Sequence, residues 1–207
     1  MQIYAGIGKP TLLAIPFFIL AGVIMDHSGI SQRLVNLADA MVGHKTGGLA
    51  IVCVIVSCFF AAISGSGPAT VAALGAVMIP AMIQSGYGTR NSAALMSASG
   101  SIGIIIPPSI PFVVYAGISG VSVGKIFMAG IVPGILMGVA LAVTAYILLK
   151  RSGNKVVAQE KASGQVRWNA FKDAFWGLLM PVIILGGIYG GVFTPTEAAA
   201  VAAVYGL

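Results

Sequence analysis

Long apolar segments separated by short polar ones run through most of this 207-residue chain. Six of them predict membrane helices, at residues 10–25, 47–63, 69–83, 91–119, 125–149 and 174–192. A seventh begins near residue 196 and has barely started when the sequence ends, so we expect a longer parent protein. The pattern predicts an all-α polytopic membrane protein.

The segment 91–119 is too long for one straight helix across a bilayer. It would measure about 43 Å, against a hydrocarbon core of about 30 Å. Pro107, Pro108 and Pro111 interrupt it, and each lacks the N–H that a carbonyl four residues back would accept. The carbonyls predicted to be left free are those of Gly103, Ile104 and Pro107. Free carbonyls inside a membrane suit a cation, so the break predicts a binding site.

The segments 47–63 and 69–83 are short for spanning, at about 17 and 15 residues. Only the sequence Ser-Gly-Ser-Gly-Pro at 64–68 joins them, which favours a re-entrant helical hairpin over two full spans. At its tip the arriving helix presents its partially negative carboxyl end, and the departing helix presents its partially positive amino end. A simple tight turn between two helices is the alternative.

The side chains of this tip fit a binding role. Gly65 and Gly67 allow close backbone approach, and Ser64, Ser66 and Thr70 carry hydroxyls that can ligate Na⁺ or donate to a carboxylate. A serine-glycine tip and a proline break in neighbouring segments are typical of secondary transporters, whose sites form at the membrane midplane between discontinuous helices.

Composition excludes a soluble domain, because 58% of residues are hydrophobic, 8% are charged and the mean hydropathy is +1.01. The net charge of +6 does not indicate nucleic acid, because six of the eleven basic residues lie in the loop 150–173. Such a cluster predicts a cytoplasmic loop. Alternation then places nine basic residues inside and only Lys9 and Lys125 outside, whether 47–83 is a hairpin or two spans.

Three shorter patterns have structural interpretations. Thr194-Pro-Thr-Glu197 is a capping box that starts the last helix. The aromatic residues before residue 177, Trp168 among them, predict an interfacial anchor on an amphipathic approach helix. Residues 31–42 predict an interfacial helix, and the acidic and histidine residues at 26–44 do not converge on a metal-ligand set.

Motifs distributed along almost the whole chain resemble one family, the large membrane subunit of TRAP (tripartite ATP-independent periplasmic) transporters. They lie at residues 14–22, 34–48, 60–66, 103–111, 129–134 and 191–198. The resemblance implies a multi-pass protein of the bacterial inner membrane. It also implies an elevator-type transporter, of which this chain contains one half of an inverted repeat.

The resemblance further implies a Na⁺-coupled symporter that imports small organic acids, such as C4-dicarboxylates or sialic acid. Its partners would be a periplasmic substrate-binding protein and a small four-helix membrane subunit, separate or fused, within membrane lipid and without nucleic acid. No cofactor is expected, and Na⁺ is the coupling ion. The expected Na⁺ ligands, mainly backbone carbonyls, are Ser64, Ser66, Gly103, Ile106 and Pro108. The candidate substrate contacts are Ser66, Gly67, Thr70 and Ser109.

Three regions follow from this interpretation. Residues 1–46, a membrane helix and an interfacial helix, would be scaffold-like. Residues 47–120 would be part of the transport domain, with the hairpin 47–83 and the broken helix 91–119. Residues 121–207 would add further membrane helices around the basic loop 150–173. Two other functions stay open. A passive ion channel could use the same carbonyls, and an intramembrane serine hydrolase could use Ser66, although no histidine follows it in the sequence. We expect that the protein is not an enzyme.

Overall fold

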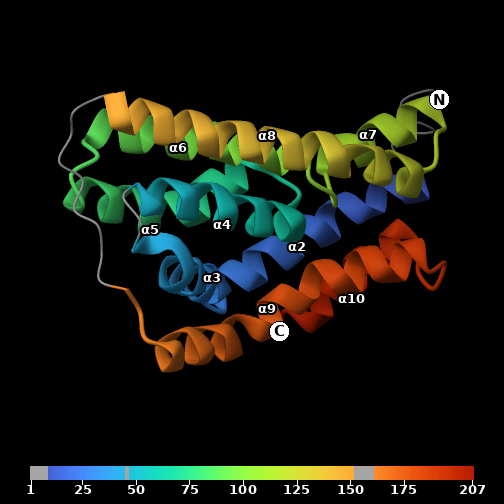
Figure 1. Ribbon diagram of the computed structural model, residues 1–207. Coiled ribbons are helices and arrows are strands. Elements are labelled where there is room, and N and C mark those ends of the chain that lie inside the picture. The colour runs from blue at the N-terminus through green and yellow to red at the C-terminus, as the bar shows by residue number, and fades with distance from the viewer. Residues whose placement is uncertain (1–8, 45–46, 152–160) are drawn as a thin grey trace.

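The computed structural model describes residues 9–44, 47–151 and 161–207, and every regular element in them is helical (Figure 1). In chain order these elements are η1 (Pro10–Leu13), α2 (Ala14–His27), α3 (Ile30–Ala38), the π-turn η2 (Asp39–Gly43), α4 (Gly48–Ser64), α5 (Gly67–Gln84), α6 (Thr89–Gly100), η3 (Ser101–Ile104), α7 (Ile110–Ser119), α8 (Val123–Arg151), α9 (Gly164–Tyr189) and α10 (Pro195–Tyr205). Lys45 and Lys155, which the charge count includes, lie outside the described residues.

Within the described residues, four helical stretches are long and apolar enough to cross a membrane: Pro10–His27, α5, α8 and α9. The helices α4 and α7 are shorter apolar helices. The expected boundaries agree with these within a few residues except at α9, which begins at residue 164 rather than 174. No proline or glycine interrupts residues 165–176, so the amphipathic approach and the apolar span form one continuous helix, capped by Ser163.

The helices pack in two groups around a shared core. The long helix α8 lies along α4, α6 and α7, whereas α9 and α10 lie along α3 and α2 (Figure 1). Large side chains between these helices are fully buried, among them Phe18, Phe60, Met78, Met96 and Phe127. Close packing of these side chains holds the helices together.

The hairpin of α4 and α5 extends only part of the way along α8. At its open end, a Cβ atom on Gly47 would lie 3.6 Å from the ring of Tyr146, near the end of α8. Farther along, a Cβ on Gly138 would lie 3.2 Å from Cys58 Sγ, and one on Gly134 would lie 2.7 Å from the Ile106 side chain. The tip after Ser64 and the interruption near Ile106 therefore lie level with the middle of α8 (Figure 1).

Several basic residues of the described chain lie at the two ends of the bundle. The start of α6 and the end of α8 lie at one end of Figure 1, and the start of α2 and the end of α7 lie at the other. Lys9 belongs to the second end, since its ammonium group donates to the carbonyl of Gly117. Lys125, in the first turn of α8, lies there too.

The last helix begins with the expected capping box. Thr194 Oγ1 accepts from the backbone N–H of Glu197, and the Glu197 carboxylate accepts from the backbone N–H of Thr194 at 2.8 Å. The Thr194 backbone N–H and the Thr194 hydroxyl both donate to the Glu197 carboxylate and hold its pKa below its usual value. Glu197 therefore stabilises the exposed start of α10.

Candidate functional site

The tip of the hairpin is built from glycine conformation and two helix caps. α4 ends because Gly65 adopts a left-handed conformation, with φ of 61°, and its N–H bonds the Ala61 carbonyl at 2.9 Å. Ser66 is extended, and its hydroxyl accepts from the Ala69 N–H at the start of α5, where Pro68 occupies the first turn. The chain thus reverses in two residues.

The interruption of the second element follows from its prolines. After Gly100 the chain tightens into the 3-10 turn η3, and residues 105–109 are irregular, with a cis peptide bond between Pro107 and Pro108. Ser109 then caps α7, because its hydroxyl accepts from the Phe112 N–H. Pro111 lies in the first turn of α7, where a missing N–H costs nothing.

The tip and the interruption touch, backbone against backbone, although about forty residues separate them. The N–H of Ile110 donates to the Gly65 carbonyl at 3.0 Å. A Cβ on Gly65 would lie 2.6 Å from the carbonyl oxygen of Pro108, and one on Gly103 would lie 3.1 Å from that of Ser66. The structure therefore brings together the two segments in which the candidate residues lie.

The carbonyls of the interruption differ from one another. Gly103 O has no donor in the following turn, because Ile106 N–H bonds Ile102 O instead and residues 107 and 108 are prolines. The prediction that the Ile104 carbonyl is also free is wrong, because Ser109 Oγ donates to it at 2.8 Å. A serine five residues on replaces the donor that the proline removed.

The candidate hydroxyls are largely engaged within the protein. Thr70 is fully buried and donates to the Ser66 carbonyl at 2.8 Å, and Ser64 Oγ lies 3.3 Å from Thr70 Oγ1. Ser109 is also fully buried and is held between Ile104 and α7. Ser66 is less enclosed than these three. The engaged hydroxyls fix the shape of the tip, and Ser66 remains the candidate side chain nearest to open space, whereas Gly67 is buried.

That open space is a groove of about 370 Å³ between α2 and the hairpin. Ser64 and Ser66 line it on one side, and Gly22 and Asp26 line it on the other. A Cβ on Gly22 would lie 3.1 Å from Ser64 Cβ, so glycine lets α2 approach the tip, and the Asp26 carboxylate accepts from Ser31 at 2.8 Å. Sequence reasoning did not single out Gly22, and it considered Asp26 only as a metal ligand. The signals were a glycine inside an apolar helix and an ionisable residue at its end.

Comparison with known proteins agrees with this architecture. A family model described as "Tripartite ATP-independent periplasmic transporter, DctM component" matches residues 1–207. The chain belongs to this family.

Among its curated relatives, the isethionate TRAP transporter permease protein DctMQ of Oleidesulfovibrio alaskensis is 52% identical over 99% of this chain and 32% of its own length. The C4-dicarboxylate TRAP transporter large permease protein DctM of Rhodobacter capsulatus is 46% identical over 99% of the chain and 49% of its own length. The sialic acid TRAP transporter large permease protein SiaM of Vibrio cholerae is 43% identical over the full chain and 48% of its own length. The chain thus spans half or less of these relatives.

Proposed function

We propose that this chain is part of the large membrane subunit of a Na⁺-coupled symporter that imports small organic acids. Membership of the DctM family supports a transport function, and the observation that carries the proposal is the contact between the hairpin tip and the proline break. Relatives named for isethionate, a C4-dicarboxylate and sialic acid make a small organic anion the favoured substrate. The periplasmic binding protein and the small four-helix subunit are its proposed partners, in the bacterial inner membrane.

For Na⁺ we propose the backbone carbonyls of Ser64, Gly103, Ile106 and Pro108, with Ser66 beside them. The carbonyl of Gly103 supports this, since it has no backbone donor in the following turn. The carboxyl end of α4 adds a partial negative charge next to it. A small hard cation prefers such oxygen ligands.

For the substrate we propose contacts from Ser66 and Gly67 at the amino end of α5, where N–H groups and the helix dipole favour an anion. Thr70 and Ser109 belong to the same proposed site but act through their hydrogen bonds to the Ser66 carbonyl and the Ile104 carbonyl. Thr70 thereby positions Ser66, and Ser109 fixes the proline break that packs against the tip.

We also propose that the hairpin α4–α5 is re-entrant and moves as part of an elevator-type transport domain, residues 47–120, against the scaffold-like region 1–46. The 17 residues of α4 extend about 26 Å, less than the hydrocarbon core of about 30 Å, whereas α5, with 18 residues, is longer than the expected segment 69–83 and long enough to cross. The tip of the hairpin lies level with the middle of α8. For the region 121–207 we propose α8 and α9 as the further membrane helices, with α10 as the start of another.

The test is uptake by the full-length protein in proteoliposomes, with its small subunit and its binding protein. We expect uptake of an organic acid only when both a Na⁺ gradient and the loaded binding protein are present. Uptake that persists without Na⁺, or without the binding protein, contradicts the proposal. Ionic conductance without the binding protein would favour the passive channel instead.

A further inference from the structure

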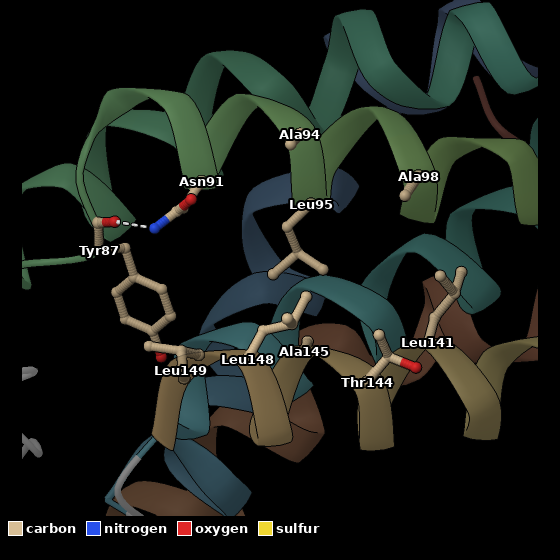
Figure 2. A pocket seen from close by; sticks show the side chains of 10 residues that line it. All are labelled: Tyr87, Asn91, Ala94, Leu95, Ala98, Leu141, Thr144, Ala145, Leu148 and Leu149. Carbon is tan, nitrogen blue, oxygen red and sulfur yellow. Dashed lines mark hydrogen bonds between the residues drawn. The ribbon is translucent and has the colours of Figure 1, made fainter. Parts of the chain in front are cut away.

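A second groove shares no lining residue with the groove at the hairpin tip. It is a groove of about 360 Å³ between α6 and the second half of α8 (Figure 2). Its lining residues are Tyr87, Asn91, Ala94, Leu95, Ala98, Leu141, Thr144, Ala145, Leu148 and Leu149. Alanines and leucines form most of the wall, so the groove suits an apolar occupant.

The polar groups of the wall are mostly at one end. The Tyr87 phenol accepts a hydrogen bond from the Ala50 N–H at 3.2 Å, and the Asn91 amide donates to the Tyr87 carbonyl (Figure 2). Burial raises the pKa of the Tyr87 phenol, so it stays neutral at physiological pH. Beyond this end the groove offers almost only hydrocarbon.

Three exposed basic residues stand at the same end of the groove. Arg90 directly precedes Asn91, and Lys150 and Arg151 directly follow Leu149 at the end of α8. No carboxylate among the described residues forms an ion pair with any of them. A cluster of cations at the mouth of an apolar groove complements a negatively charged headgroup attached to a hydrocarbon chain.

The length of the groove matches one leaflet of a bilayer. On α8 it runs from Leu141 to Leu149, which is about 12 Å at 1.5 Å per residue, against about 15 Å for half of the hydrocarbon core. Its Leu149 end lies beside the basic end of α8, where the positive-inside rule puts the cytoplasm, and its Leu141 end lies near the middle of α8.

We propose that this groove binds one phospholipid with an anionic headgroup. One acyl chain lies between α6 and α8 along Ala94 and Leu148, and the phosphate lies among Arg90, Lys150 and Arg151. This site is distinct from the proposed transport site and does not depend on what the protein transports.

The charge of the site is tested by native mass spectrometry of the full-length protein, delipidated in detergent and offered equimolar phosphatidylglycerol and phosphatidylethanolamine. We expect the protein to retain phosphatidylglycerol about fivefold or more in preference, and the triple variant Arg90→Gln/Lys150→Gln/Arg151→Gln to lose that preference. The matched control is Lys125→Gln, which removes an exposed cation at the opposite end. Equal retention by wild type and triple variant overturns the proposal.

The position of the acyl chain is tested separately. Ala94→Phe fills the groove and is expected to reduce bound phosphatidylglycerol severalfold, whereas Val139→Phe, on an exposed part of α8 outside the groove, leaves it unchanged. A benzophenone amino acid at Leu148 then identifies the occupant of the groove in a membrane. Crosslinks to lipid support the proposal. Crosslinks to the protein's own remaining chain or to its small subunit overturn it.

Discussion

At the scale of single residues, the hairpin tip depends on glycines whose missing side chains leave room for backbone. Gly65 meets two conditions that favour glycine. Its φ is positive, and the Pro108 carbonyl occupies the space where a Cβ would lie. Gly103 meets only the second condition, against the Ser66 carbonyl. The contact between the tip and the break is therefore encoded at a few positions.

Gly65→Ala is expected to abolish transport by the full-length protein, because the added methyl group cannot fit 2.6 Å from the Pro108 carbonyl. The control is Gly120→Ala, which has a similar positive φ of 74° but nothing within 4 Å of its Cβ. Both variants carry backbone strain of about 1–2 kcal/mol, so only the clash separates them. Similar uptake by the two variants contradicts close approach at Gly65.

Pro107→Ala supplies an N–H that can compete with Na⁺ for the Gly103 carbonyl. We expect the half-saturating Na⁺ concentration for uptake to rise roughly fivefold, the factor that about 1 kcal/mol gives. Pro111→Ala is the matched control, because position 111 lies in the first turn of α7, where an added N–H changes no ligand. If the two variants show the wild-type Na⁺ activation curve, the Gly103 carbonyl is not a ligand.

At the scale of elements, α8 supports the break by presenting glycines to it. Gly130, Gly134 and Gly138 recur every four residues on one face and lie against Phe112, Ile106 and Cys58, respectively. This spacing places them in line along the helix, so the irregular segment 105–109 can pack close to the α8 backbone. A discontinuous element in a membrane needs such a neighbour, because lipid cannot satisfy its backbone.

Gly130→Ala is expected to destabilise the protein by about 1–3 kcal/mol, because its Cβ would lie 2.4 Å from the Phe112 ring and 2.7 Å from the Ile105 carbonyl. The same substitution at Gly186, inside α9 with nothing within 4 Å, is expected to be neutral or stabilising by up to about 1 kcal/mol. Thermal unfolding of the two detergent-solubilised variants measures the difference. Equal midpoint temperatures of unfolding for the two variants would show that α8 tolerates a side chain where it contacts the break.

At the scale of the whole molecule, the distribution of basic residues predicts the orientation of the protein in the membrane. The length of the hairpin predicts how deeply its tip enters the membrane. Both ends of the bundle can be identified by their basic residues, and the hairpin tip lies between them. The half of the relatives' length that this chain lacks is expected to complete the proposed transport site. Orientation is therefore the whole-molecule property that the described residues predict most directly.

Single-cysteine variants test this orientation. Thr89→Cys, at the start of α6, is expected to react with a membrane-impermeant thiol reagent only after cells are opened, because Arg90 and the basic loop put it in the cytoplasm. Ser122→Cys, at the start of α8, is expected to react in intact cells once the outer membrane is permeable. The reverse pattern of labelling would invert the topology.

The sequence by itself determined the helices, because hydrophobic runs and breakers act locally. Pro107 and Pro108 break the segment 91–119 wherever it packs, and the capping box at Thr194 needs only its own four residues. The family was also accessible from sequence motifs. The helix α9 begins ten residues before the expected residue 174. The expected boundary followed the start of the apolar run, whereas the helix extends back as far as no proline or glycine interrupts it.

Only the tertiary structure decided which carbonyls stay available and which groups meet. Three observations show this: Ser109 bonds the Ile104 carbonyl, Gly22 lies against Ser64, and a groove lies between α6 and α8. Each depends on how side chains pack in the folded protein. A proline removes a donor locally, but packing in three dimensions determines whether another group replaces it.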